Sequence, residues 1–243
     1  MHIVLAGGGV DSTVVIAQCV KAGIKPVLLF CDYGQRSAYQ ERLAVSRLAR
    51  HYGLRHEVVR SYFPSHDDHI MFDPDAAYVN HTIAPEVANS MGSRAWIIPY
   101  RNLFLLSVAA MVAGVKGTEE VWVGFDAANA GSTADCRQDV VDYFQQAVTL
   151  AADGTPPFTI RSPLTNVAKS TIYRRGVRLD VPFELTWSCY NNFSKRCGVC
   201  TACAARKYLS AKVGLDDPIQ YLSEVELESR LTKEAYADYV RCR

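Results

Sequence analysis

The sequence predicts an α/β protein with a doubly wound, parallel, five-stranded sheet and a small zinc-binding segment near its C-terminus. Short apolar runs, typical of buried strands, alternate with longer segments of helical character along most of the chain. Such alternation favours a parallel sheet with helices on both faces. Four clustered cysteines follow the last of these segments, and clustered thiolates commonly bind a structural metal ion.

Length and composition are those of a soluble globular protein. The 243 residues suffice for one large α/β domain with a small appendage, and 49% of them are hydrophobic. The formal net charge of +1 gives no sign of a basic surface, so we expect no direct nucleic-acid binding. Apolar runs stay well short of a membrane span and no signal peptide is predicted, so we expect a cytoplasmic protein without membrane contact.

The predicted strands and helices alternate in chain order, and Gly23 ends the first helix. We predict strands at 2–6, 26–31, 54–59, 120–124 and 158–161, and helices at 14–20, 37–51, 103–114, 138–151 and 167–175. Residues 61–94 interrupt the alternation, and we interpret them as an insertion that acts as a lid or an oligomer contact. The histidines and aspartates at 65–69 are interpreted as a solvated loop rather than as metal ligands.

A glycine-rich loop between the first strand and the first helix is the main candidate for a phosphate site. Gly7, Gly8 and Gly9 let the backbone turn sharply and approach a ligand closely. The helix that follows offers unpaired N–H groups and a positive dipole end, and Ser12 and Thr13 add hydroxyl donors. The charge of Asp11 repels a bare phosphate, so its presence indicates a Mg²⁺ ion between the carboxylate and the phosphates.

Three alternatives to this interpretation are considered. A Walker loop requires a lysine before the serine or threonine, and the loop has none. A dinucleotide-binding loop fits the position of Asp32, 21 residues after Asp11, but Ser12 stands where that loop needs glycine or alanine. A glycine-rich turn without a ligand is the third alternative.

Two further segments are expected at the same edge of the sheet. Residues 32–35 follow the second strand, and the carboxyl ends of parallel strands share one crevice. Asp32 at this position can also be a helix cap. Asn102 is predicted to cap the helix at 103–114. Arg101 then lies at the mouth of that helix, where its guanidinium suits a phosphate or a carboxylate, although a surface ion pair is the commoner role.

The cysteine cluster has the spacing Cys-x7-Cys-x2-Cys-x2-Cys, formed by Cys189, Cys197, Cys200 and Cys203. Four thiolates satisfy a tetrahedral Zn²⁺ ion and leave no open position, which defines a structural site. An iron–sulfur cluster is the rival, but the further cysteine and proline expected after Cys203 are absent. We therefore divide the chain into residues 1–185 and a zinc-binding, helical region at 186–243.

The glycine loop resembles the pyrophosphatase loop of the N-type ATP pyrophosphatase superfamily, Ser-Gly-Gly-x-Asp-Ser, with Gly7 in place of the serine. Over roughly 3–60 and 95–220 the chain resembles one family of that superfamily, the 7-cyano-7-deazaguanine synthases of the queuosine pathway. The motif Thr-Trp-Ser-Cys-Tyr at 186–190, followed by the cysteine spacing, is the specific part of the match. The other matching pieces are 32–35, Pro99, Arg101, Asn102, 135–137, 162–164, Lys169 and 217–221.

The resemblance implies an adenine nucleotide alpha hydrolase-like fold and an enzyme that adenylates 7-carboxy-7-deazaguanine with ATP. Ammonia then gives the amide, and a second activation gives the nitrile. ATP, Mg²⁺ and Zn²⁺ are the implied cofactors, and we expect a homodimer. The implied catalytic residues are Asp11, Lys169 and Arg101; the ATP-binding residues are Gly7, Gly8, Gly9, Asp11, Ser12, Thr13 and Asp32; the substrate-binding residues are Tyr33, Gln35, Arg101, Asp135 and Arg137.

The segment at 129–137 departs from the family pattern. The family carries Asp-Tyr-Ser-Gly-Tyr-Pro before Asp-Cys-Arg, whereas this chain has Asn-Ala-Gly-Ser-Thr-Ala at 129–134. The lost tyrosines remove stacking surface and hydroxyl groups. The departure indicates a divergent member, and the leading alternative is a ligase that joins the activated acid to an amine on a protein. A non-enzymatic nucleotide-binding scaffold is a further alternative, disfavoured by Asp11, Ser12 and Lys169.

Overall fold

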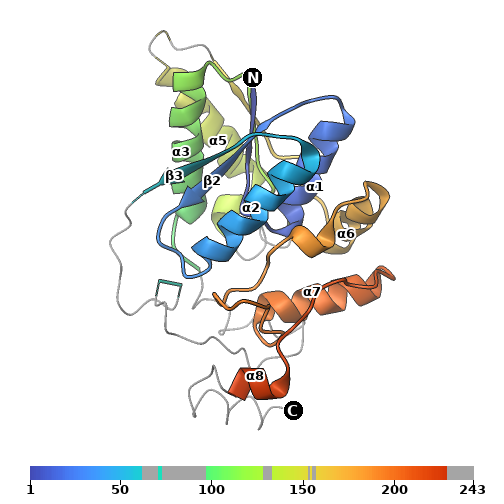
Figure 1. Cartoon of the computed structure of the whole chain (residues 1–243). Helices are drawn as coiled ribbons and strands as arrows, with labels where there is room; N and C mark the ends of the chain where they lie inside the picture. The colour runs from blue at the N-terminus through green and yellow to red at the C-terminus, as the bar shows by residue number, and fades with distance from the viewer. Residues whose placement is uncertain (62–70, 73–96, 128–132, 153, 155–156, 229–243) are drawn as a thin grey trace.

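A computed structural model describes residues 1–61, 71–72, 97–127, 133–152, 154 and 157–228 (Figure 1). Within these residues five strands form one sheet in the order β3-β2-β1-β4-β5, and all neighbouring strands are parallel. The predicted fold class is therefore confirmed. The strands are β1 His2–Leu5, β2 Val27–Asp32, β3 His56–Arg60, β4 Glu120–Trp122 and β5 Thr159–Arg161.

Helices cover both faces of the sheet because successive strand residues point to opposite sides. From β1 and β2, Val4 and Leu28 pack into the core with α1, α2 and α6, whereas Ile3 and Leu29 pack into the core with α3 and α5. Figure 1 shows these two groups of helices on opposite sides of the strands. Their bounds are α1 Val10–Lys21, α2 Ala38–Tyr52, α6 Lys169–Arg178, α3 Arg101–Lys116 and α5 Gln138–Leu150.

The strand order reverses at β1, with β2 and β3 on one side and β4 and β5 on the other. In open parallel sheets the ligand-binding loops gather beyond the carboxyl ends of the strands at such a reversal. The loop after β4 lies directly against the helix after β1, since a Cβ on Gly124 would be 2.9 Å from the backbone N of Ser12. The fold therefore brings the loops after β1 and β4 together.

The start of α3 differs from the prediction. The helix begins at Arg101, and Tyr100 occupies the N-cap position in the left-handed region with φ of 60°. Asn102 is 2% exposed and lies inside the first turn, so the prediction that it caps this helix is wrong. Its side chain donates to Asp135 and Cys136 instead. A tertiary hydrogen bond has thus replaced the local capping bond that the sequence suggested.

The C-terminal segment is fastened to the main sheet by buried contacts. Leu209 joins the core formed by α1, α2 and α6. The guanidinium of Arg206, 2% exposed, donates to the Phe183 carbonyl and the Thr186 hydroxyl and pairs with Asp217 at 2.9 Å. The elements of this segment are η3 Phe183–Leu185, α7 Thr201–Lys212 and α8 Glu224–Glu228.

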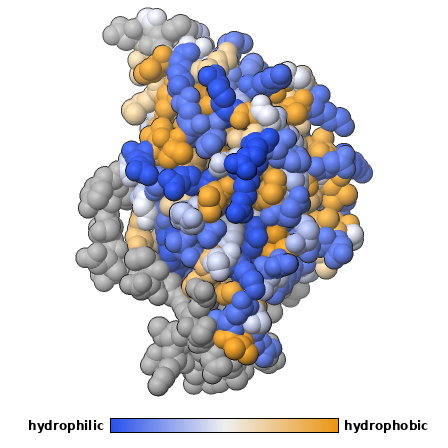
Figure 2. All heavy atoms as spheres, viewed as in Figure 1, coloured by the Kyte–Doolittle hydropathy of each residue, from blue (hydrophilic) through white to orange (hydrophobic). Residues whose placement is uncertain are grey.

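Some predictions fall outside the described ranges. Of the expected insertion at 61–94 the structure describes only residues 61, 71 and 72, and of the loop at 129–134 only residues 133 and 134. The prediction of a solvated loop at 65–69 lies outside these ranges. No helix among the described residues combines the length and apolar character needed to cross a membrane. On the face shown in Figure 2, polar and apolar side chains are interspersed.

Candidate active site and metal centre

The glycine loop joins β1 to α1 and has the geometry of a ligand-binding turn. Gly8 has φ of 72°, and a Cβ there would lie 2.9 Å from both the Ala44 Cβ and the Glu41 carbonyl oxygen. Gly9 is the N-cap residue of α1, and its carbonyl accepts hydrogen bonds from the side chains of Ser12 and Thr13. The first-turn amides of such a helix have no intrahelical acceptor, so they are available to an anion.

A row of three charged side chains lies beside this loop. Lys169, the first residue of α6, places its Nζ 2.6 Å from Asp11 Oδ2 and 2.7 Å from Asp126 Oδ2. Asp11 belongs to the first turn of α1, and Asp126 follows β4. The structure thus brings together two of the three predicted catalytic residues and adds Asp126, which is fully buried.

The other carboxylate oxygen of Asp11 is a fitting Mg²⁺ ligand. Asp11 Oδ1 is buried and has no hydrogen-bond partner among the described residues. Burial raises the pKa of Asp11, and the charge of Asp126 adds to this rise, while Lys169 opposes it. The positive charge of Lys169 is held by its two partners, which raise its pKa against the effect of burial. An unsatisfied buried oxygen next to a phosphate-binding turn suits a divalent cation.

Asp126 was missed in the sequence analysis, although the sequence carries a signal for it. It follows the predicted strand at 120–124, and that strand proves to be the neighbour of β1 at the reversal of the sheet. A carboxylate two residues past Gly124 therefore meets the loop after β1. Recognising that the fourth strand is adjacent to the first would have pointed to this residue.

The loop after β2 is shaped by its own side chains. Gln35, 3% exposed, accepts from the Tyr33 backbone N–H and donates to the Cys31 carbonyl and to Glu41. Asp32 accepts from the Gly34 N–H at 3.2 Å. Gln35 thus holds the loop that presents Asp32 and Tyr33, and its predicted contact with substrate stays a prediction.

Tyr33 and Arg101, both predicted substrate-binding residues, hydrogen-bond to each other. The ring of Tyr33 is 7% exposed and packs edge-on against Phe72 and Phe104, at 6.3 and 6.5 Å between ring centroids. Burial raises the pKa of Tyr33 to about 12, so its hydroxyl stays neutral at physiological pH and its oxygen accepts from the Arg101 guanidinium. The pair joins the end of β2 to the start of α3.

Asp135 fixes the start of α3, whereas Arg137 lies at the surface. The Asp135 carboxylate accepts hydrogen bonds from the backbone N and the side-chain amide of Asn102, both at 2.9 Å. Asp135 is 8% exposed and therefore positions the turn that carries Arg101. The side chain of Arg137 is 53% exposed and pairs with Asp139 at 3.1 Å. The structure brings Asp135 next to the predicted site and does not bring Arg137 to it.

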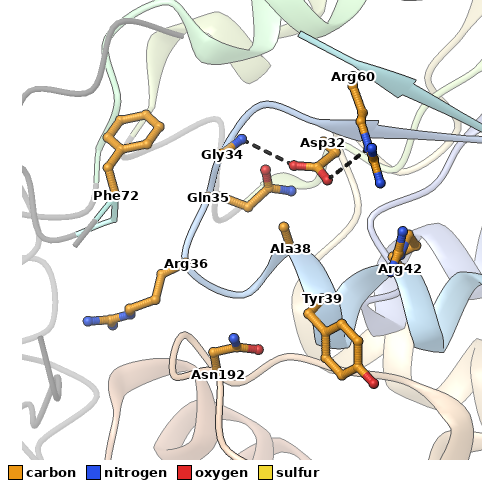
Figure 3. Close-up of a pocket in the computed structure, with 10 residues that line it drawn as sticks. All are labelled: Asp32, Gly34, Gln35, Arg36, Ala38, Tyr39, Arg42, Arg60, Phe72 and Asn192. Carbon is orange, nitrogen blue, oxygen red and sulfur yellow. Dashed lines mark hydrogen bonds and ion pairs between the residues drawn. The ribbon is translucent and has the colours of Figure 1, made fainter. Parts of the chain in front are cut away.

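A pocket of about 450 Å³ opens beyond the carboxyl end of β2 (Figure 3). In Figure 3 the side chain of Asp32 lies between Gly34 and Arg60, which it contacts at 3.2 and 4.0 Å. Three arginines and two aromatic rings make the lining basic and suited to an anionic, ring-bearing ligand. The arginines are Arg36, Arg42 and Arg60, and the rings are those of Tyr39 and Phe72.

The four predicted metal-ligating cysteines converge on one point. The Sγ atoms of Cys189, Cys197, Cys200 and Cys203 all lie within 4.8 Å of one another, and all four residues are buried. Hydrogen bonds among the four thiols lower the pKa of Cys197 and raise that of Cys203, and burial raises the pKa of Cys189, so without a metal the negative charge gathers on one sulfur. A bound cation favours the thiolate form of all four. Backbone N–H groups of residues 191, 197 and 200 also point at the sulfurs. The donor set fits a closed tetrahedral metal site.

Comparisons with known proteins identify the family of this chain. The family model described as "Queuosine biosynthesis protein QueC" matches residues 1–213. A 7-cyano-7-deazaguanine synthase of Chlorobium phaeobacteroides strain BS1 is 33% identical over 230 residues, covering 90% of this chain and 96% of the relative. Another, from Methanoculleus marisnigri, is 31% identical over 221 residues, covering 90% and 97%.

Among solved structures, the NMN synthetase of Francisella tularensis matches with a TM-score of 0.44 and 15% identity, covering 100% of this chain and 86% of that one. The NH3-dependent NAD synthetase of Campylobacter jejuni matches with a TM-score of 0.43 and 13% identity, covering 99% and 82%. The family assignment comes from the sequence match, which spans nearly the whole chain. On that evidence this chain belongs to the QueC family.

Proposed function

We propose that this protein uses ATP to activate 7-carboxy-7-deazaguanine as an acyl adenylate, and that ammonia converts this intermediate to the amide and then to 7-cyano-7-deazaguanine. The observation that carries the proposal is the Asp11–Lys169–Asp126 row beside the glycine loop, in a chain of the QueC family. Such a row supplies a metal-binding carboxylate and a fixed positive charge at the same place. A metal ion on that carboxylate and the fixed positive charge would both stabilise the negative charge on the leaving pyrophosphate.

The phosphates of ATP are assigned to the glycine loop. The first-turn amides of α1 receive them, together with Ser12, whereas Thr13 is buried and supports the turn through its bond to the Gly9 carbonyl. Asp11 would hold Mg²⁺ through its unpartnered oxygen, and the ion would offset charge on the departing pyrophosphate. Lys169 contacts the other oxygen of Asp11 and also Asp126, so its positive charge would stay beside the phosphates. The remainder of ATP is assigned to the loop of Asp32 and the pocket beyond it.

The acid substrate is assigned to the space beside Tyr33 and Arg101. The guanidinium of Arg101 suits the carboxylate of the substrate, and the neutral Tyr33 hydroxyl holds the guanidinium in place. Asp135 fixes the turn from which Arg101 extends. We retain Gln35 and Arg137 as candidate contacts from the sequence.

The proposed reaction has three steps. A carboxylate oxygen of the substrate attacks the α-phosphorus of ATP, and pyrophosphate leaves. The ammonia nitrogen then attacks the acyl carbon, AMP leaves, and a proton is lost to give the amide. The amide oxygen attacks the α-phosphorus of a second ATP, and pyrophosphate leaves. Loss of AMP and of both amide protons then gives the nitrile. The acyl adenylate is needed because a free carboxylate is a poor acyl donor.

The cysteine cluster is proposed to hold one structural Zn²⁺ ion. Four buried thiolates complete its coordination, so this ion takes no part in the reaction. We also propose that the protein works in the cytoplasm as a homodimer.

The test is ATP-dependent pyrophosphate release with and without 7-carboxy-7-deazaguanine, followed by mass spectrometry of the products with and without ammonia. We expect pyrophosphate release that requires the acid, and a product that contains nitrogen from ammonia. Pyrophosphate release at the same rate with and without the acid would refute 7-carboxy-7-deazaguanine as the substrate. ATP binding without any turnover would favour the nucleotide-binding scaffold instead.

The altered segment at 129–134 supports a second candidate function, the transfer of the activated acid to an amine on a protein. The sequence there lacks the family's two tyrosines and proline, and we propose that its smaller side chains admit a larger amine than ammonia. The same mass spectrometry separates the two candidates. Acid-dependent AMP formation without amide or nitrile from ammonia favours the protein amine.

A further inference from the structure

The glycine loop is held by the segment that leads into the cysteine cluster. The backbone N–H of Trp187 donates to the carbonyl of Gly8 at 2.7 Å. The carbonyl of Trp187 also approaches the loop, since a Cβ on Gly9 would lie 3.8 Å from it. The proposed ATP phosphates and the proposed metal ligands are therefore connected through one residue.

Trp187 is itself locked onto the cysteine segment. Its indole N–H donates to the carbonyl of Cys189, one of the four clustered cysteines, at 2.8 Å. The guanidinium of Arg196 lies 4.7 Å from the centroid of its ring. Trp187 is 4% exposed and packs in the same core as the four cysteines. A shift of Cys189 would therefore be passed to Trp187.

The opposite side of the loop is held by the same core. Ala44 of α2 packs with Trp187 and Cys189, and it lies against Gly8 so closely that no side chain fits there. Gly8 is thus confined between α2 and Trp187 at a positive φ. Both contacts depend on how the cysteine core is packed.

We infer that metal occupancy of the cysteine cluster and ATP binding at the glycine loop are thermodynamically coupled, and that Trp187 is the positioning residue that carries the coupling. A bound metal fixes Cys189, Cys189 fixes Trp187, and Trp187 holds the Gly8 carbonyl so that the loop amides face the phosphates. Coupling of this kind is reciprocal, so ATP must tighten metal binding by the same factor by which the metal tightens ATP binding. The ATP half of this inference rests on the proposed function.

The decisive experiment measures the zinc affinity of the intact protein. Equilibrium competition with a chromogenic chelator gives the Kd for Zn²⁺ with and without saturating ATP and Mg²⁺, and calorimetry confirms that ATP is bound. We expect ATP to lower this Kd by about 5-fold or more, within the usual range of coupling factors. An unchanged zinc Kd with ATP bound would overturn the inference.

A matched pair of tryptophan substitutions tests the role of Trp187. Trp187→Phe removes the hydrogen bond to Cys189, and we expect it to reduce the ATP effect on the zinc Kd by about fivefold, the equivalent of one hydrogen bond. Trp122→Phe is the control, because its indole N–H donates to Glu120 within β4. The control should keep the full ATP effect. Equal effects of the two substitutions would refute a specific role for Trp187.

Hydrogen exchange without ATP separates this inference from the proposed function. In the zinc-loaded Trp187→Phe protein we expect faster amide exchange in residues 5–13 and unchanged exchange in β2, compared with the Trp122→Phe protein. This readout does not depend on ATP. Failure of ATP to bind would therefore refute the ATP site, whereas unchanged exchange in residues 5–13 would refute the connection through Trp187.

Discussion

The ammonium of Lys169 and the carboxylate of Asp11 lie 2.6 Å apart, although 158 residues separate them in the chain. The contact joins the first turn of α1 to the first residue of α6 and lies at the point where the sheet reverses. A carboxylate and a fixed cation are thereby placed side by side at the glycine loop. The consequences of this pairing can be tested residue by residue.

Asp11→Asn should abolish acid-dependent pyrophosphate release while the protein stays folded. Burial raises the pKa of Asp11, so its ionised form costs folding free energy at neutral pH, and a neutral side chain relieves that cost. Lys169 keeps Asp126 as its partner. We expect a rate loss of about 10³-fold or more, because charge stabilisation of the leaving group is removed. A pyrophosphate assay and a thermal melt give both readouts.

The matched control is Asp139→Asn, which removes an exposed carboxylate that pairs with the exposed Arg137 and accepts from the backbone N–H of Val140. Its activity and melting temperature should stay near those of the unmodified protein. Undiminished pyrophosphate release by a folded Asp11→Asn protein would exclude Asp11 from the chemistry.

The acid limb of the activity profile should report Asp11. Since burial and the charge of Asp126 both raise its pKa, Asp11 takes up a proton, and loses its Mg²⁺ affinity, at a higher pH than an exposed aspartate would. Asp126→Asn removes one of these two causes, so the pKa of Asp11 should fall and the limb should move to lower pH. The measurement is kcat/KM for ATP against pH for both proteins. If the acid limb of the Asp126→Asn protein moved to higher pH, Asp126 could not be raising the pKa of Asp11, and this prediction would be wrong.

One zinc ion per chain is expected by elemental analysis, and Cys200→Ser should strongly destabilise the protein. A structural zinc contributes on the order of 10 kcal/mol in isolated small domains, and we expect a smaller loss inside this larger fold. Cys19→Ser is the comparison, since Cys19 is equally buried but lies in α1, away from the cluster. Iron in the purified protein, or normal stability without metal, would refute the zinc assignment.

The sequence was a good guide to local structure and a weaker guide to contacts between distant segments. Strand periods, the glycine loop and the cysteine spacing are local patterns, and each predicted its element to within a few residues. The role of Asn102 was mistaken because its partner, Asp135, lies 33 residues away. Asp126 was overlooked because its neighbours are set by the order of strands in the sheet, which no single segment encodes.

Asn102→Ala should weaken binding of the acid more than that of ATP. The substitution leaves Asp135, 8% exposed, without the side-chain donor it now has, which costs about 1–3 kcal/mol in a buried setting. The turn that carries Arg101 then loosens, so KM for the acid should rise. Ser107→Ala is the control, since that hydroxyl bonds only locally within the exposed face of α3. Equal KM changes for ATP and the acid would contradict this role.

The last prediction concerns residues 129–134, which lie mostly outside the described part of the chain. We predict that this segment, rather than the glycine loop, determines the product. Asp135 and its partner Asn102 are buried and fixed at the end of the segment, so the substrate side of the site keeps its support. The sequence at 129–134 lacks the family's two tyrosines and proline.

We predict that the smaller side chains at 129–134 admit a larger amine or let water reach the acyl adenylate. We therefore expect ATP- and acid-dependent AMP formation with little nitrile from ammonia alone, measured by mass spectrometry. Replacing residues 129–134 with Asp-Tyr-Ser-Gly-Tyr-Pro should raise nitrile formation, because the aromatic side chains and the proline close the wall around the adenylate. If the replacement changed only the affinity for ATP, the segment would act on ATP rather than on the product, and this prediction would be wrong. Complete conversion of the acid to the nitrile by the unmodified protein would show that the altered segment does not change the reaction. It would also refute the transfer of the acid to an amine on a protein.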